Sequence, residues 1–348
     1  MKKVIAMLLA VAMVLTFIAC AKTEKQDTQK ADAATPVADA SSAGETEQSG
    51  KKRVIGIGTY SMDNTAIYPL IQAMVDGVTA RGDEYVLVSA SGADDTARLL
   101  EIGEEFTARD DMAGIIFNNI NDTLYTDVVA KCNEKGIPVV FNDIPFACDE
   151  DHKVTANVVN DNYGAGVACA QRLADDFDGK ANVILFVHRG NAAVAARTEG
   201  IYDTFANYPD INVLYEGLVT LSVEEASKNM EDLLMTYDNI DAVIGICDNT
   251  PIGCVAAIKA QGREGIKLYS IDGSKDIMPY IKSGDIVMTA AQDFTRMGEE
   301  SCKALYAALD EGATDYNVEI LCEAPVVDSS NVDEWIDKFE NAQYTFIK

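Results

Sequence analysis

The chain has 348 residues, 48% of them apolar and 24% charged, and this composition excludes a wholly disordered, collagenous or disulfide-scaffold protein. One hydrophobic core rarely spans more than about 250–300 residues, so two core-bearing units are expected. The 56 acidic residues outnumber the 28 basic ones and give a formal net charge of -28, which argues against nucleic acid as a partner.

The first residues have the pattern of an export signal. A basic start precedes an apolar run at 4–18 that is too short to span a membrane comfortably, so residues 1–19 predict a signal peptide. The sequence Phe-Ile-Ala-Cys at 17–20 resembles the lipobox of bacterial lipoproteins, with Phe17 where Leu is usual. The resemblance implies that Cys20 is diacylated and becomes the new N-terminus. Ordinary cleavage nearby, with Cys20 incidental, is the alternative.

Residues 21–50 are rich in Ala, Thr, Ser, Gln, Asp and Glu, with one Pro and no aromatic residue. Such a segment buries too little apolar surface to offset its chain entropy. Together with the lipidated cysteine, residues 20–50 predict a flexible tether. It would hold a globular body at the outer face of the cytoplasmic membrane, in the periplasm or at the cell surface, within reach of a membrane partner.

From residue 53 onward, short apolar runs alternate with longer amphipathic stretches. The runs predict strands at 54–58, 85–89, 114–117, 138–142, 154–159, 183–187, 212–218, 242–246, 267–271 and 286–290. The amphipathic stretches predict helices at 69–81, 97–109, 124–135, 162–177, 193–207, 224–236, 250–261 and 295–311. Strands that alternate with crossover helices form parallel sheets covered on both faces, so the predicted fold class is doubly wound α/β.

Polar residues follow most of the predicted strands. They lie at 59–64, 118–119, 143, 160–162, 188–191, 248–249, 272–273 and 292–293. Any one of them has an ordinary explanation as a helix N-cap or an Asx turn. Because ligands of open parallel sheets bind at the carboxyl ends of the strands, their recurrence in both halves predicts a cleft for a small polar ligand.

The element order and several motifs resemble the periplasmic sugar-binding proteins of the ribose and glucose/galactose type, which are the receptors of ABC importers. The resemblance covers about residues 53–327, and R-x-x-G at 197–200, the Asp-Gly strand end at 269–273 and Thr-Ala-Ala-Gln at 289–292 carry it most specifically. It implies a type I periplasmic binding protein fold, in which three hinge crossings join two doubly wound lobes. The implied N-terminal lobe is 51–160 plus 293–322, and the implied C-terminal lobe is 161–292 plus 323–348.

The same resemblance assigns ligand contacts position by position. The implied ligand-binding residues are Tyr60, Asp63, Asn64, Asp143, Asn162, Asn191, Arg197, Cys247, Asp272 and Gln292. A hydroxyl-rich ligand suits such a set, because its hydroxyls both donate and accept: carboxylates such as Asp143 and Asp272 would accept, and the Arg197 guanidinium would donate.

Departures from the family pattern bear on the ligand. Three positions that match the family's stacking aromatic rings are Ala66, Ile67 and Leu221 here, and Cys247 stands where an amide is usual. The expected ligand is a monosaccharide or related polyol, and a nucleoside-like ligand stays open. No counterpart of the galactose type's calcium loop is found, so neither a metal nor a cofactor is expected.

Three other classes of protein are to be compared with the sequence. A Rossmann-type enzyme fails because Gly56-Ile-Gly58 lacks the third glycine, which Ser61 replaces, and because no nucleophile with a matching base is recognisable among two histidines; no enzyme activity is expected. A repressor fails because the N-terminus carries an export signal. A co-receptor for a sensor kinase or chemoreceptor stays open beside an importer permease as partner, with a monomer expected.

The chain has eight cysteines and no C-x-x-C pair, so a structural zinc site is not predicted. Without Cys20 the count is odd, which argues against a complete disulfide framework.

Overall fold

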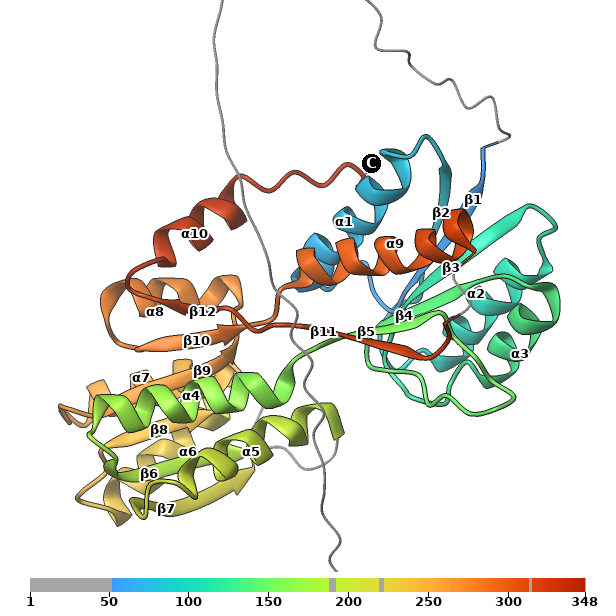
Figure 1. The fold of residues 1–348 in the computed structure, drawn as a ribbon. Helices are drawn as coiled ribbons and strands as arrows, with labels where there is room; N and C mark the ends of the chain where they lie inside the picture. Colours follow the sequence, from blue (N-terminus) through green and yellow to red (C-terminus); the bar gives the residue numbers. More distant parts are fainter. Residues whose placement is uncertain (1–51, 188–191, 219–221, 313–314, 348) are drawn as a thin grey trace, which may run out of the picture. The chain divides into compact units, whose positions relative to one another are not determined.

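The computed structural model describes residues 52–187, 192–218, 222–312 and 315–347, and Figure 1 shows its helices and strands. The predicted signal peptide, Cys20 and the tether at 20–50 lie outside the described residues. Within the described part of the chain, no helix is both long enough and apolar enough to cross a membrane.

The first sheet has six parallel strands in the order β11-β5-β4-β3-β1-β2. They are β1 (Val54–Thr59), β2 (Glu84–Ser89), β3 (Met112–Asn119), β4 (Val139–Asp143), β5 (Ala156–Asn160) and β11 (Val318–Cys322). Helices α1 (Tyr68–Thr79) and α9 (Phe294–Glu311) pack their apolar sides on one face. Helices α2 (Thr96–Ala108) and α3 (Thr126–Lys135) cover the other face. Burial on both faces explains why these strands are almost continuously apolar.

The second sheet repeats this arrangement in the order β12-β10-β9-β8-β6-β7, with only β12 antiparallel. Its strands are β6 (Lys180–Val187), β7 (Asp210–Leu218), β8 (Ala242–Gly245), β9 (Lys267–Asp272), β10 (Met288–Ala291) and β12 (Val326–Asp328). Helices α4 (Asn162–Asp176) and α5 (Ala192–Phe205) cover one face. The opposite face carries α6 (Val223–Thr236), α7 (Asn249–Ala260), α8 (Met278–Ser283) and α10 (Val332–Glu340).

The chain passes between the two sheets three times, from β5 to α4, from β10 to α9 and from β11 to β12. The predicted fold class, two doubly wound parallel sheets joined by three crossings, is confirmed. Because both sheets have the same strand order, β4 of the first sheet occupies the position of β9 in the second. The carboxyl ends of these two strands are therefore the places to compare for function.

The structure adds elements that the periodicity did not predict. Strands β11 and β12 and helices α8 and α10 are all short, and β11 is an edge strand whose side chains are mostly exposed. The segment 323–348, expected to belong to one lobe, contacts elements of both sheets. Helix α10 packs on the second sheet, whereas Tyr344 and Phe346 contact Tyr68 of α1 edge to face.

All seven cysteines of the body lie in the described residues and form no disulfide there; six are buried and Cys148 is half-buried.

Candidate functional site

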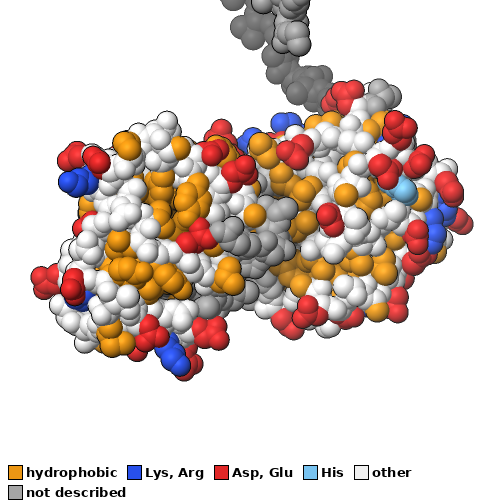
Figure 2. All heavy atoms as spheres, turned by 90° about the horizontal axis from the view of Figure 1, so that it is seen from below, with side chains coloured by type: hydrophobic (Ala, Val, Ile, Leu, Met, Phe, Trp, Pro, Cys, Tyr) orange, Lys and Arg blue, Asp and Glu red, His pale blue; other side chains and the backbone are white. Residues whose placement is uncertain are grey.

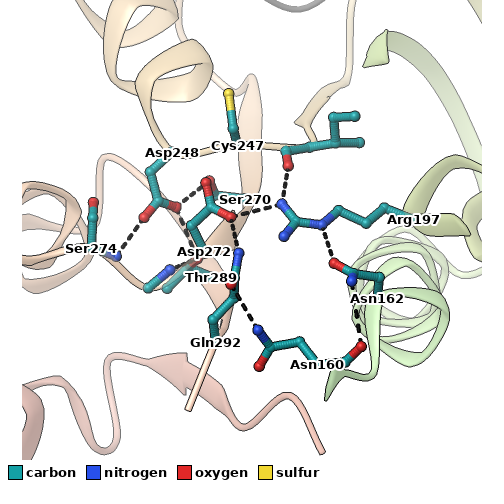
Figure 3. Close-up of polar contacts among 12 residues, drawn as sticks. Asn160, Asn162, Arg197, Cys247, Asp248, Ser270, Asp272, Ser274, Thr289 and Gln292 are labelled. Carbon is teal, nitrogen blue, oxygen red and sulfur yellow. Dashed lines mark hydrogen bonds and ion pairs between the residues drawn. The ribbon is translucent and has the colours of Figure 1, made fainter. Parts of the chain in front are cut away.

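Arg197 is the centre of the polar cluster drawn in Figure 3. It lies on α5 with only 4% of its surface exposed. Its Nε donates to Asn162 Oδ1 over 2.7 Å, and its Nη1 donates to the carbonyl oxygen of Ile246 and to Asp272 Oδ1, each over 2.7 Å. Charge-assisted hydrogen bonds of this kind are the stronger sort, and they fix the guanidinium plane.

Gln292 extends this cluster to the crossings between the sheets. Its Nε2 donates to Asp272 Oδ1 over 2.8 Å, and its Oε1 accepts from Asn160 Nδ2 over 2.8 Å. Asn160 ends β5 and Gln292 follows β10, so one hydrogen bond joins two of the three crossings. The Oδ1 atom of Asn160 is buried and has no hydrogen-bond partner among the described residues. Asn160 was not among the predicted ligand residues.

Asp143 and Asp272 end the equivalent strands β4 and β9, and both have a positive φ, at 75° and 132°. Non-glycine residues rarely adopt such a backbone, and they do so mostly where the surroundings impose it at functional sites. Burial raises the pKa of Asp143 to about 6, while nearby Arg197 and a hydrogen bond with Asn118 act in the opposite direction and Asp272 raises it further. The carboxylate of Asp143 thus belongs to the same electrostatic environment as Arg197 and Asp272.

The first loop places its three predicted residues differently. Asn64 Nδ2 donates to the Tyr60 hydroxyl over 2.8 Å, and Asn64 Oδ1 caps the short helix η1 (Thr65–Ile67) by accepting from the amide of Ala66. Burial, with Asp143 as the second cause, raises the pKa of Tyr60 to about 12. Asp63 is exposed, and its carboxylate makes no hydrogen bond within the described part of the chain.

Cys247 is buried beside Asp248, and its Sγ lies 3.5 Å from Thr250 Oγ1. It contributes, with Asp272 and Gln292, to the wall of a cavity of about 1190 Å³. Other parts of the wall come from η1, α1, the start of α7, the turn from Gly273 to Asp276, the start of α9 and the segment from Trp335 to Tyr344.

The two described positions without the family's aromatic ring have different surroundings. Ala66 is exposed and lines the cavity, whereas Ile67 is buried in the core between the first sheet and helices α1 and α9. Asn191 and Leu221 lie outside the described residues. No group of three His, Cys, Asp or Glu in residues 52–187, 192–218, 222–312 and 315–347 is placed to hold a metal ion.

Taken together, the predicted residues Asn162, Arg197, Asp272 and Gln292 form one hydrogen-bonded cluster, and Asp143 lies within its electrostatic reach. Fixed donors and carboxylate acceptors in a partly buried setting suit a ligand whose hydroxyls both donate and accept. The cluster holds no nucleophile with a base beside it.

Comparisons with known proteins identify the family of this chain. A family model described as a periplasmic binding protein domain matches residues 55–314. The xylitol-binding protein of Mycolicibacterium smegmatis is 29% identical over 221 residues, which cover 63% of this chain and 62% of that protein. The D-apiose import binding protein of Actinobacillus succinogenes is 24% identical over 82% of this chain and 91% of its own length.

Solved structures show the same fold. The arabinose-binding protein of Geobacillus stearothermophilus superposes with a TM-score of 0.74 at 21% identity, over 82% of this chain and 99% of that one. The family model covers most of the chain, and the two-sheet architecture agrees with it. The chain therefore belongs to the periplasmic binding protein family.

Proposed function

We propose that this protein captures a small hydroxyl-rich ligand, a monosaccharide or related polyol, and delivers it to the membrane permease of an ABC importer. The cluster of Asn162, Arg197, Asp272 and Gln292 binds the ligand, and Asp143 adds a carboxylate from the first sheet. The buried Arg197, which holds Asp272 at the carboxyl end of β9, is the observation that carries the proposal. A missing ligand hydroxyl would leave one of these polar groups unpaired, at a cost of about 1–3 kcal/mol.

The relatives support this ligand class. The two curated relatives named above bind xylitol and take part in D-apiose import, according to their names. Xylitol is a polyol and D-apiose is a five-carbon sugar, and both molecules are uncharged and carry several hydroxyls. Binding without turnover of the ligand is part of the same proposal, and it is supported by the names of these relatives, which are binding proteins.

The remaining expectations are part of the same proposal. The signal peptide at 1–19 is removed, Cys20 is lipidated, and residues 20–50 tether a monomeric body at the outer face of the cytoplasmic membrane. The N-terminal lobe comprises 51–160 plus 293–322. The C-terminal lobe comprises 161–292 plus 323–348, although the contacts of Tyr344 and Phe346 with α1 link its last residues to the other lobe.

Isothermal titration of the purified body with a panel of pentoses, hexoses and their alditols tests the proposal. One compound is expected to bind with 1:1 stoichiometry, and Asp272→Ala or Arg197→Ala is expected to abolish binding while circular dichroism still shows a folded protein. Asp127→Ala is the matched control, because Asp127 is an exposed aspartate on α3 that is not among the predicted ligand-binding residues. A panel without any binding would refute the sugar or polyol assignment.

A further inference from the structure

Asp248 is a buried carboxylate that none of the predicted ligand contacts includes. It follows β8, precedes α7 and is only 2% exposed. Its Oδ1 accepts from Ser270 Oγ over 2.6 Å and from Thr289 Oγ1 over 2.9 Å, and its Oδ2 accepts from the amide of Ser274 over 2.6 Å (Figure 3). Three donors, two from β9 and the turn after it and one from β10, therefore converge on one side chain.

These three donors surround the turn that carries Asp272. Ser270 and Thr289 are register partners on β9 and β10, and Thr289 Oγ1 also accepts from the amide of Gly273 over 3.1 Å. The turn passes through positive φ at Asp272 and again at Gly273, where φ is 73°. A Cβ atom at Gly273 would overlap Ala291 of β10. The turn is thus strained, tightly packed against β10 and held by the hydrogen bonds of Asp248.

Burying a carboxylate is costly, and an apolar side chain in the same space often serves stability equally well. The setting of Asp248 has that cost: burial raises its pKa to about 7, and the neighbouring Asp272 carboxylate adds to the effect. Hydrogen bonds from Ser270 and Ser274 act in the opposite direction. Each oxygen of the Asp248 carboxylate accepts a hydrogen bond from the turn or from a hydroxyl beside it. A buried carboxylate with these partners is better explained by holding the turn in place than by filling space in the core.

We propose that Asp248 is a positioning residue for ligand binding. Through Ser270, Thr289 and Ser274 it holds the turn from Asp272 to Ser274 in its strained conformation. In that conformation Asp272 meets Arg197 and Gln292 and presents its carboxylate to the ligand. The inference rests on the proposed function only in taking Asp272 as a ligand contact.

Thr289 offers the sharpest test, because its hydroxyl connects Asp248 to the amide of Gly273 and a valine has the same shape without that hydroxyl. Removing one partner of a buried hydrogen bond costs about 1–3 kcal/mol, so Thr289→Val is expected to weaken ligand binding about tenfold to a hundredfold. Thr289→Ser retains the hydroxyl and is expected to restore affinity to within about threefold of the original chain. Asp248→Asn retains one acceptor, so its ligand affinity is expected to lie between the affinities of Thr289→Ser and Asp248→Ala.

The matched control is Thr107→Val, which removes a buried hydroxyl that bonds the carbonyl oxygen of Gly103 within α2. It is expected to leave ligand affinity unchanged. A double-mutant cycle of Asp248→Ala with Thr289→Val is expected to be non-additive, since each change removes the hydrogen bond between these two side chains. Equal affinity of Thr289→Val and the original chain, or full additivity in the cycle, would overturn the proposal.

A ligand-free measurement separates this proposal from the proposed function. Amide hydrogen exchange of the unliganded protein is expected to be faster at residues 272–276 in Thr289→Val than in Thr289→Ser, with the exchange of the first sheet unchanged. Unchanged exchange at 272–276 would refute the positioning role even if no sugar ever bound. Conversely, a failed ligand panel together with faster exchange would refute only the ligand class. If Asp248→Ala does not fold, the threonine pair still decides the question.

Discussion

The two strand-end aspartates show how the site is built at the scale of single residues. Asp143 and Asp272 occupy equivalent positions in the two sheets, and each ends its strand with a positive φ. Their environments differ, because Asp272 accepts hydrogen bonds from Arg197 and Gln292 whereas the pKa of Asp143 is raised, chiefly by burial. Asp143 is therefore the carboxylate that the ligand-free protein stabilises less well.

Replacing Asp143 is expected to stabilise the folded protein and to weaken ligand binding. Asp143→Asn removes the cost of burying a charge, and asparagine tolerates positive φ, so the substitution adds no backbone strain. At pH 7.5 the variant should raise the free energy of unfolding of the ligand-free protein by about 1–2 kcal/mol, as judged by urea denaturation. Ligand affinity should fall at the same time, because the neutral amide is a weaker acceptor than a carboxylate.

The pH dependence of that stability difference gives the control. The pKa of Asp143 in the folded protein, about 6, lies above its ordinary value of 3.8. Its contribution to stability is therefore fully present below about pH 4 and is lost as the pH rises through about 6. The gain from Asp143→Asn should vanish below about pH 4. An increase in the free energy of unfolding that is equally large at pH 4 would contradict burial of the Asp143 charge as its cause.

The sequence could identify several of these residues and not others, for physical reasons. Arg197, Asp272 and Gln292 lie in short motifs that resemble those of the family, so the resemblance could predict them from the sequence. Asn160 acts through its contact with Gln292, and Asp248 acts through hydroxyls on β9 and β10. Both roles depend on contacts between segments distant in sequence, which no local pattern encodes.

At the scale of secondary-structure elements, the contact between α4 and α5 fixes the height of Arg197 above the second sheet. A Cβ atom at Gly166 of α4 would overlap the carbonyl oxygen of Arg197 itself. A Cβ atom at Gly200 of α5 would overlap the carbonyl oxygen of Tyr163. The two helices therefore approach each other more closely than residues with side chains would allow.

Gly166→Ala is expected to disturb the site without touching a ligand group. The added methyl meets backbone, which cannot rotate away, so α5 must shift and carry Arg197 with it. Overpacking of this kind costs about 1–3 kcal/mol of stability, and we expect ligand affinity to fall as well. Thermal denaturation and calorimetric titration measure the two effects. Gly92→Ala is the control, since a Cβ atom there meets nothing within 4 Å; equal behaviour of the two variants would contradict the close-packing argument.

The C-terminal segment joins elements that belong to different sheets. Helix α10 packs Trp335, Ile336 and Phe339 against the core of the second sheet. Further on, the amide of Thr345 donates to Gln72 Oε1 of α1 over 2.6 Å, and Gln72 Nε2 donates back to Thr345 Oγ1 over 2.9 Å. Beside this pair, the rings of Tyr344 and Phe346 lie 5.1 and 5.4 Å from that of Tyr68. The described residues after Asn341 thus form a strap that connects α10 to α1.

Ending the chain after Asn341 is expected to release this strap. Loss of two edge-to-face aromatic pairs and their burial should lower the free energy of unfolding by about 1–3 kcal/mol. Hydrogen exchange should rise in α1 and stay unchanged in α2, which the strap does not contact. Tyr344→Leu combined with Phe346→Leu retains part of the apolar contact and should give an intermediate loss. A truncated chain with unaltered stability and exchange would show that the strap contributes nothing.

At the scale of the whole molecule, the sequence could predict the fold class but not the strand pairing or the shortest elements. Alternation of apolar runs with amphipathic stretches identifies ten strands and eight helices, and parallel sheets follow from that alternation alone. Assigning the strands to two separate sheets required the family resemblance, because hydrogen-bond partners such as β5 and β11 lie about half the chain apart. Strand β12 spans only Val326–Asp328, too few residues to show a period.

The net charge of -28 shapes the outer surface more than the site. Figure 2 shows Asp and Glu side chains around the rim of the face in view, with few Lys and Arg among them. Such a surface keeps copies of the protein apart and is repelled by anionic lipid headgroups. Charge attraction to anionic lipids therefore does not favour attachment of the body to a membrane, and the proposed lipid anchor at Cys20 would supply the attachment.

Cys20→Ser tests that anchor. A diacylated N-terminus inserts two acyl chains, which suffice for stable attachment. The serine variant should consequently move from the membrane fraction to the soluble fraction on ultracentrifugation, and it should no longer incorporate labelled palmitate. Ligand affinity of the released protein should equal that of the body alone, because the proposed binding residues all lie beyond residue 51. The matched control is Cys148→Ser, which changes the one half-buried cysteine of the body and should leave fractionation unchanged. Membrane association that survives Cys20→Ser would exclude lipidation as the means of attachment.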